Sequence, residues 1–502
     1  MELKKKIQNP PKAIRSNLAY YASIVANLAT FGSSVVSAFF LNVYYDTITN
    51  KNNNNWDAET RKNNLSALSL CYNLGGLSGL LLSFMVYRLN PRLVLNLSRV
   101  AISVSYLFLA IPNIYVMLVS RFLANLFSVI AQITIRWTVY ELYLDKDQSK
   151  VMVALTLSAP ASDLLISIRS KFDPGDALYW RLALGILPSL LILSLLLDLF
   201  CSRGLNSVTY LLKQKGRQRA LEQLKQVFFD EYTEALVEKI DKQIKAEERE
   251  KLRLSEKGVS QWGMDLAIYE SSFTSLMMVC FLGTFGFQMQ YVSNGLIIGS
   301  KYLDDFASTR RTKTALFLQT ILELICYILV LMLNLAKKRK TSILISIVVA
   351  FLVLTSSCVG YLFNNLDIVR LGMIGLAPSF PFFFPAIHLY ANDLVPPSLL
   401  PWQPVFYYVI DSVADSAMPF LFDFEETTHK SIGIKFGLLA ALCLVSLVLI
   451  NFLMIETEGM TREELRVIHD RRWGSGSKGG YVELGKNEMI GETPRTKDPL
   501  EG

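Results

Sequence analysis

The sequence contains few of the residues that build metal sites, disulfide frameworks and most enzyme active sites. Only 3 of its 502 residues are histidine, and its 6 cysteines are nowhere paired at close spacing. This distribution indicates neither a disulfide framework nor a zinc site. The sequence also lacks a phosphate-binding P-loop, a His-Glu-x-x-His zinc motif and a nucleophile elbow. We therefore expect no enzyme activity, no metal and no cofactor.

Charged residues are scarce as well, and they are segregated. They make up 19% of the chain, against about a quarter in typical soluble proteins, whereas 52% of the residues are hydrophobic. Lysine and arginine lie in loops between long apolar runs, where they orient helices in a bilayer. The net charge of +7 therefore does not indicate nucleic-acid binding, which needs a basic stripe on a soluble face. The expected surroundings are membrane lipid.

About twelve apolar stretches are each long enough to cross a bilayer as a helix, which takes about 20 residues. The predicted fold class is all-α: a polytopic membrane protein with about twelve transmembrane helices in two six-helix bundles. The expected spans are 18–43, 64–87, 94–112, 114–143, 150–169, 179–200, 268–299, 314–335, 342–363, 367–391, 402–422 and 432–454.

Blocks of charge divide the chain and orient it. The excess of lysine and arginine around the ends and the central segment places both termini on the inner side. Leucines at helical spacing, followed by a Glu/Lys-rich run, predict an amphipathic central linker. The predicted organisation is an inner tail (1–17), an N-terminal bundle (18–200), a linker (201–267), a C-terminal bundle (268–456) and an inner C-terminal tail (457–502). The plasma membrane and the mitochondrial inner membrane both fit this pattern.

Four stretches resemble motifs of one transporter family, in the family's order. They are 121–123 with 140–141, 210–221, the pair Gln288 and Asn294, and 456–465. Gln288 and Asn294 keep the spacing of the Gln-Gln-x-Ser-Gly-x-Asn sugar motif, and Glu456-Thr457-Glu458-Gly459 is similar to Pro-Glu-Thr-Lys-Gly. With six plus six spans, the chain resembles the sugar-porter branch of the major facilitator superfamily, or its organic-ion branch. The resemblance implies alternating access for a small polar, hexose-like solute.

The inner salt-bridge motifs of that family are incomplete in this chain. The loop after span two lacks the motif's aspartate and glycines, and the arginine expected seven residues after Glu141 is Gln148. Because that network locks the two halves in one state, its loss predicts a changed transport cycle or none. The resemblance implies these gating residues: Glu141, Asp393, Arg88, Arg92, Lys338 and Arg339.

Polar residues inside the expected spans are candidates for the solute site. The amides of Gln288 and Asn294 suit sugar hydroxyls, although amides also hydrogen-bond between helices. Asp411 and Asp415 are four residues apart, so they share a helix face and suggest a cation or proton partner, unless both lie at the inner interface. Alignment with the family adds His388. The expected substrate-binding residues are Gln288, Asn294, His388, Asp411 and Asp415.

Two further features bear on transport. Ser34 stands where proton-coupled sugar porters have a carboxylate, so facilitated diffusion is expected. Arg136 and Asp163 are expected to pair between neighbouring spans as charge compensation.

Three functions fit the sequence. The first is a sugar-porter-like facilitator. The second is a transport-inactive, transporter-derived structural subunit of a larger membrane complex, for example a mitochondrial one, whose other subunits hold the charged, Gly/Ser-rich tail. The third is an organic-cation facilitator, motivated by Asp411 and Asp415.

Overall fold

The structure is a computed structural model. It describes residues 13–51, 58–86, 89–109, 111, 113–158, 160–161, 177–256, 258, 310–394, 429–460 and 465. Within these ranges the regular elements are helices, and the single β-type contact is an isolated bridge between Ile14 and Phe228.

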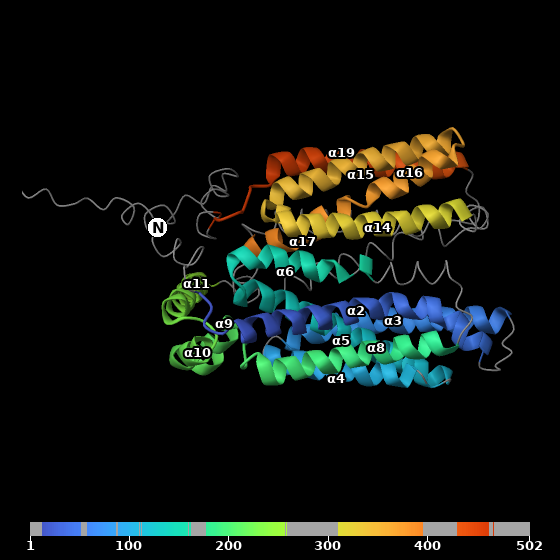
Figure 1. Ribbon diagram of the computed structural model, residues 1–502. Helices are drawn as coiled ribbons and strands as arrows, with labels where there is room; N and C mark the ends of the chain where they lie inside the picture. Colours follow the sequence, from blue (N-terminus) through green and yellow to red (C-terminus); the bar gives the residue numbers. More distant parts are fainter. Residues whose placement is uncertain are drawn as a thin grey trace, which may run out of the picture. The chain divides into compact units, whose positions relative to one another are not determined.

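The first half of the chain forms long helices that follow the predicted spans (Figure 1). Helix α5 packs against α2, α3 and α4, and α8 packs against α2 and α4. The helix at predicted span five (150–169) begins at Asp145, earlier than expected. The elements are α2 (Asn17–Lys51), α3 (Ala58–Val86), α4 (Pro91–Leu109), α5 (Ile114–Leu142), α6 (Asp145–Thr156) and α8 (Ala177–Leu196), which continues as the π-helix η1 (Leu197–Cys201).

The second half forms another group of packed helices. Helix α15 contacts α16, α17 and α19, and α14 contacts α16 and α17. The elements are α14 (Arg310–Leu333), the short 3₁₀ helix η3 (Leu335–Lys337), α15 (Arg339–Leu362), α16 (Leu366–Leu376), α17 (Ser379–Leu394) and α19 (His429–Leu453). Predicted spans seven (268–299) and eleven (402–422) lie outside the described residues.

Predicted span ten (367–391) falls within one stretch that is long and apolar enough to cross a membrane, Leu366–Leu394, and this stretch is divided into α16 and α17. The two helices are separated at Ala377, whose next residue is Pro378. A proline lacks the backbone N–H that a helix interior uses, and it disfavours helical geometry in the residue before it. The local sequence around Pro378 therefore accounts for the break between α16 and α17.

The long helices carry the burial pattern of a membrane protein. Within the described part of the chain, five helices are long and apolar enough to cross a membrane. Large apolar side chains such as Leu97, Leu193 and Leu352 are exposed on their outer faces, whereas serines such as Ser128 and Ser346 are buried. This distribution suits lipid on the outside, because hydrocarbon solvates leucine but not hydroxyl groups.

Glycines bring α3 and α5 close together. A β-carbon at Gly75 would collide with the carbonyl group of Phe122, and one at Gly79 would lie 2.6 Å from the carbonyl oxygen of Leu126. Small residues four apart allow this backbone approach in membrane helices. The α3–α5 contact therefore depends on the absence of side chains at these two positions.

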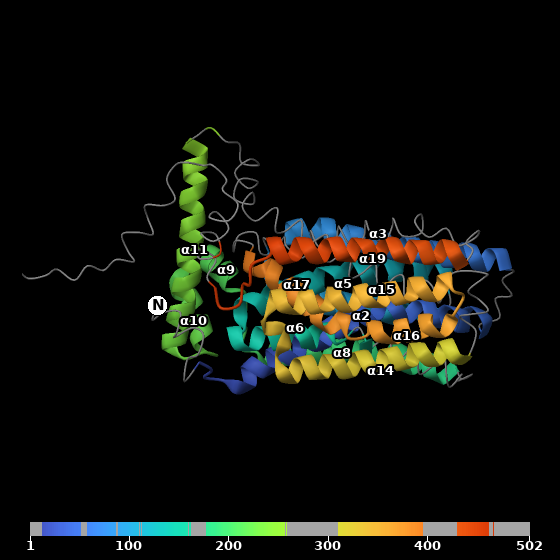
Figure 2. The ribbon, with the colours of Figure 1, turned by 90° about the horizontal axis from the view of Figure 1, so that it is seen from above.

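The central segment folds as helices at one end of the bundles. It consists of α9 (Val208–Tyr210), the π-helix η2 (Leu211–Lys215), α10 (Gly216–Lys225) and α11 (Asp230–Glu256). In Figures 1 and 2, α11 runs across the direction of the long helices. Residues 13–15 are fastened to this linker, because the Arg15 N–H donates to the Val227 carbonyl at 2.8 Å and the Phe229 N–H donates to the Ala13 carbonyl at 2.9 Å.

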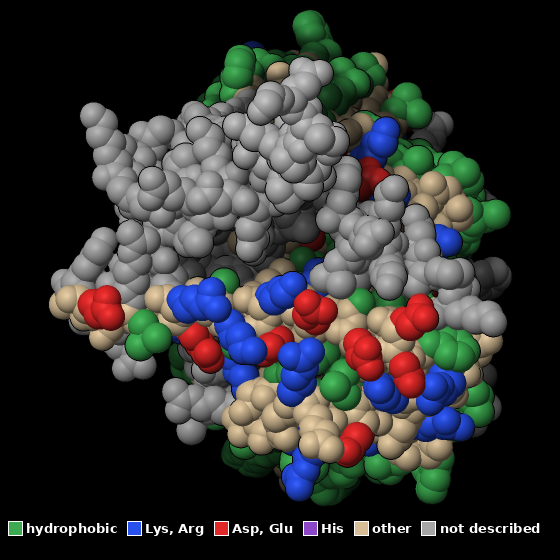
Figure 3. Space-filling view, turned by 90° about the vertical axis from the view of Figure 1, so that its left-hand side faces the viewer, with side chains coloured by type: hydrophobic (Ala, Val, Ile, Leu, Met, Phe, Trp, Pro, Cys, Tyr) green, Lys and Arg blue, Asp and Glu red, His purple; other side chains and the backbone are tan. Residues whose placement is uncertain are grey.

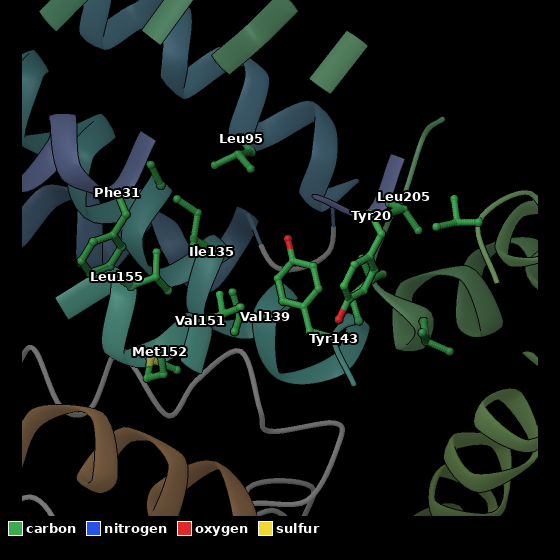
Figure 4. Packing of buried hydrophobic residues seen from close by; sticks show 14 of the residues in the cluster. Tyr20, Phe31, Leu95, Ile135, Val139, Tyr143, Val151, Met152, Leu155 and Leu205 are labelled. Carbon is green, nitrogen blue, oxygen red and sulfur yellow. The ribbon is translucent and has the colours of Figure 1, made fainter. Parts of the chain in front are cut away.

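Each half has its own apolar core. The first-half core includes linker residues as well, and Figure 4 shows Tyr20, Tyr143 and Leu205 among its members. Two residues cross between the cores: Leu389 of α17 belongs to the first-half core, and Val153 of α6 belongs to the second-half core. The halves therefore touch near the linker, through α6 and α17.

Candidate functional site

The carboxylate of Asp393, at the end of α17, collects partners from both halves. Tyr140 of α5 donates its hydroxyl to Oδ1 at 3.1 Å, and Thr457 donates to Oδ2 at 2.6 Å. Nε of Arg339 lies 3.2 Å from Oδ2. The structure thus brings together two residues expected at the gate, Asp393 and Arg339, and adds Tyr140 and Thr457.

The segment after α19 supports this cluster. Glu456 accepts a hydrogen bond from the backbone N–H of Arg339 at 2.9 Å, and Glu458 forms a salt bridge with Lys337 at 2.8 Å. Asp393, Arg339 and the 456–458 segment all belong to the second half. Their charges are therefore paired without help from the first half.

A second hydrogen bond crosses between the halves close by. Ser149 of α6 donates to Oδ1 of Asn334 at 2.6 Å. Asn334 holds a left-handed backbone conformation (φ 51°) between α14 and η3, a conformation that asparagine tolerates better than most residues. We call Tyr140, Ser149, Asn334 and Asp393 the linker-end latch.

Glu141 is buried next to the latch but binds the linker instead of an arginine. Its carboxylate accepts hydrogen bonds from the Trp137 indole at 2.7 Å, from the Ser207 hydroxyl, and from the Thr209 backbone N–H at 3.2 Å. Ser207 in turn caps α9. Glu141 therefore ties the end of α5 to the start of the linker.

Gln148, which stands where the family has an arginine, hydrogen-bonds to the end of α5. Its amide donates to the backbone carbonyls of Tyr140 at 2.6 Å and Tyr143 at 3.3 Å. A neutral amide thus closes the turn between α5 and α6.

Arg92 belongs to a buried polar network inside the first half. Its Nε donates to Oδ2 of Asp198 at 2.9 Å, and its Nη2 donates to the Asp198 backbone carbonyl at 2.7 Å. Arg99, which is 1% exposed, lies 3.6 Å from the same carboxylate and donates to Thr30 at 2.8 Å and to Asn96 at 2.6 Å. Two arginines therefore share one carboxylate.

Arg99 and Asp198 are functional candidates that the sequence analysis missed. Both lie inside expected spans, 94–112 and 179–200. Ionised residues at membrane depth are rare and usually either paired or functional. That rule alone could have singled them out.

His388 lies on the side of α17 that faces the first half. It is 1% exposed and close enough to Arg136 of α5 for the two to interact electrostatically. The guanidinium of Arg136 lies 5.4 Å from the ring centre of Phe31 in α2. The seam between the bundles therefore carries imidazole, guanidinium and aromatic groups.

Of the remaining residues expected at the site, the structure describes only Lys338. Lys338 is exposed at the start of α15, and no side-chain hydrogen bond caps that helix start. Among the residues that the structure describes, no group of three or more His, Cys, Asp or Glu side chains could hold a metal ion. The residues outside the described ranges are Gln288, Asn294, Asp411, Asp415, Arg88 and Asp163.

Solved structures of one sugar symporter have a fold similar to that of this chain. The chain is similar to the MFS proton:xylose symporter XylE bound to 6-bromo-6-deoxy-D-glucose, with 14% identity, 90% of this chain and 99% of that chain covered, and a TM-score of 0.69. A double Trp mutant of XylE gives 14% identity, the same coverage and a TM-score of 0.72. The inward open conformation of XylE from E. coli gives 14% identity, 90% and 98% coverage, and a TM-score of 0.56. At these identities the likeness shows the fold alone.

The family is shown by a second comparison. No curated protein matches the chain significantly. The family model described as Major Facilitator Superfamily, however, matches residues 22–401, well over half of the chain. The predicted family and the predicted fold class, an all-α polytopic membrane protein with two helix bundles, are confirmed. The chain belongs to the Major Facilitator Superfamily of membrane transporters.

Proposed function

We propose that this protein is a sugar-porter-like facilitator, which moves a small polar solute across a membrane by alternating access. The observation that carries the proposal is the linker-end latch, in which Tyr140 and Ser149 of the first half donate hydrogen bonds to the second half. Alternating access requires two bundles to rock about a site near the bilayer midplane. Contacts at one end must then form in one state and break in the other.

The strength of the latch suits a contact that opens repeatedly. A hydrogen bond contributes about 0.5–1.5 kcal/mol net, and about 1.5–3 kcal/mol when one partner is charged. Two such bonds bias an equilibrium by a few kcal/mol, which still leaves both states accessible. The bond from Tyr140 to Asp393 is the stronger of the two, because its acceptor is a carboxylate.

The charges at the latch stay paired when it opens. Asp393 keeps Arg339 and Thr457, which belong to its own half. Separating a buried ion pair would cost several kcal/mol. A latch of hydroxyl donors avoids that cost, which supports gating without the family's inter-half salt bridges. In this proposal Glu141 and Arg92 act within the first half, and Arg88, Lys338 and Arg339 line the same end.

The proposed solute site lies in the seam between the bundles. His388 faces the first half there, and we assign solute contacts to Gln288, Asn294, His388, Asp411 and Asp415. Amide and imidazole groups hydrogen-bond well to hydroxyls. One solved relative in fold holds 6-bromo-6-deoxy-D-glucose, which supports a hydroxylated solute of hexose size.

The proposed mode is facilitation without proton coupling. The hydroxyl of Ser34 donates to the Phe31 carbonyl at 2.7 Å and is buried. A serine cannot take up and release a proton in the physiological range, as a carboxylate can. From Asn17 to Ser34, α2 contains no aspartate or glutamate. We place the linker end, with both termini, on the inner side of the membrane.

The test is solute uptake by the full chain in proteoliposomes. We expect saturable uptake of radiolabelled D-glucose or D-xylose, reduced at least about fivefold in Gln288→Ala, because a lost buried hydrogen bond costs about 1–3 kcal/mol. The matched control is Gln226→Ala, an exposed linker position, which should transport normally. Equal uptake by both variants would refute the assigned site.

The same proteoliposomes distinguish the sugar facilitator from the two alternative functions. Flux of tetraethylammonium that is lost in Asp411→Asn would replace the sugar facilitator with an organic-cation facilitator. Absence of flux for all probes, with partner subunits co-purifying in a fixed ratio, would replace it with the structural subunit.

A further inference from the structure

A short basic segment lies at the junction of η2 and α10. Residues Lys213–Arg219 read KQKGRQR, with four basic residues and no acidic one. All seven residues are exposed. The segment follows the end of η1 at Cys201 after a short loop and α9, and clusters of basic residues close to the end of a membrane span are typical of surfaces that meet anionic lipid.

In the part of the chain that the structure describes, the neighbouring helix α11 pairs with only one of the four basic residues of this segment. Arg217 lies 3.7 Å from Asp241 of α11. Within the described ranges, Lys213, Lys215 and Arg219 have no salt bridge. The lysines of α11 differ, since Lys242 and Lys245 each pair with an acid one turn earlier. These two lysines of α11 are therefore paired, whereas Lys213, Lys215 and Arg219 are left available.

The segment is held at the level where a lipid-facing helix ends. Gln223 of α10 donates to the Gly204 carbonyl, and Arg203 donates to the Gln226 carbonyl at 3.2 Å. Both bonds fasten α10 to the loop that follows η1. In the last turn of η1, Phe200 is 79% exposed and Leu199 is 51% exposed, as expected for side chains in contact with lipid.

The surface view agrees with this placement. Figure 3 shows Lys and Arg side chains interspersed with Asp and Glu side chains at this end of the molecule, with hydrophobic side chains bordering this charged band at the lower edge of the view. Charged groups next to an apolar belt lie at the depth of lipid headgroups.

We propose that Lys213, Lys215 and Arg219 bind the phosphate headgroups of anionic lipids in the adjoining leaflet. Ammonium and guanidinium groups pair with phosphate through charge-assisted hydrogen bonds. Each basic residue at an anionic surface improves binding by a factor of about 5. Three residues then contribute a factor on the order of 100.

The test compares two triple variants of the full chain in neutral detergent. The first is Lys213→Gln, Lys215→Gln and Arg219→Gln. The matched control removes the same number of exposed charges from α11, with Lys242→Gln, Lys245→Gln and Arg249→Gln. The probes are dioctanoyl phosphatidylglycerol and dioctanoyl phosphatidylcholine, whose binding is measured by native mass spectrometry and thermophoresis.

We expect the unaltered protein and the control to prefer phosphatidylglycerol at least tenfold. The first variant should lose this preference while keeping the same melting temperature. Equal loss in both variants, or no preference in the unaltered protein, would overturn the proposal. Displacement of the lipid by an equal concentration of sn-glycerol 3-phosphate would also overturn it, because the site would then bind soluble phosphate.

Discussion

The hydroxyl of Tyr140 donates a 3.1 Å hydrogen bond to Oδ1 of Asp393, across 253 positions of sequence. Oδ2 of the same carboxylate accepts from Thr457 at 2.6 Å and lies 3.2 Å from Arg339. Of these three partners, only Tyr140 belongs to the first half. Tyr140 can therefore act as a switchable partner of a carboxylate whose charge is already balanced.

Replacing Tyr140 with phenylalanine removes this bond and keeps the ring. We expect the state with an open linker end to become about tenfold more populated, since a hydrogen bond to a charged group contributes about 1.5–3 kcal/mol. The measurement is the distance distribution between spin labels at Lys150→Cys and Lys338→Cys, two exposed positions on either side of the latch.

The control for this prediction is Tyr115→Phe, at a side chain that is 75% exposed. It should leave the distance distribution unchanged. The role assigned to the latch fails if Tyr140→Phe and Tyr115→Phe give the same distribution.

Asp198 is expected to stabilise the first half. Asp198→Asn leaves Arg92 and Arg99 without their shared negative charge, and Arg99 is almost fully buried. Removing one partner of a buried ion pair costs about 3–5 kcal/mol, which should lower the melting temperature in detergent by several degrees. Asp367→Asn, at a side chain that is 67% exposed, should have little effect.

A second substitution tests the cause of that loss. Adding Arg99→Met to Asp198→Asn removes the buried uncompensated charge and should recover part of the stability. If the double variant is less stable than Asp198→Asn alone, hydrogen bonding by Arg99 outweighs its charge.

Alanine substitutions at two glycines are expected to change stability in opposite directions, because only Gly75 lies in the close contact between α3 and α5. Gly75→Ala pushes a methyl group against the Phe122 carbonyl, and overpacking of this kind costs about 1–3 kcal/mol. Gly185→Ala on α8 meets nothing within 4 Å, and it should stabilise that helix by up to about 1 kcal/mol. Thermal unfolding of both variants measures the difference, and equal melting temperatures would contradict the packing.

The pKa of Glu238 on α11 should respond to one lysine. A hydrogen bond from Lys242, together with its positive charge, lowers the pKa of Glu238 below the ordinary glutamate value. Because the pKa is lowered in the folded state, the contribution of this pair is present above the unfolded pKa and is lost as pH falls through the folded one. In a carboxyl NMR titration, Lys242→Gln should raise the pKa, whereas Lys245→Gln, which removes the partner of Asp241, should not.

The fold could be predicted from the sequence because bilayer thickness dictates helix length. Long apolar runs such as 114–143 and 342–363 coincide with α5 and α15 to within a few residues. The division of span ten at Ala377 was missed, since a hydropathy pattern ignores the backbone effect of Pro378.

The candidate site was less predictable. Asp393 and Arg339 were expected from motif resemblance, but Tyr140 was seen only as part of a motif, and Ser149 and Asn334 were not singled out. Hydroxyl and amide groups are frequent in transmembrane helices, and their partners lie far away in sequence. Only the three-dimensional arrangement shows which of them meet.

Facilitated transport is tested most directly by uptake of radiolabelled D-glucose and D-xylose into proteoliposomes, with and without an imposed pH gradient. We predict saturable uptake of at least one sugar, which reaches equilibrium without a gradient and accelerates little when a gradient is imposed. Uptake no faster than in protein-free liposomes would contradict transport, and accumulation that requires the gradient would contradict facilitation.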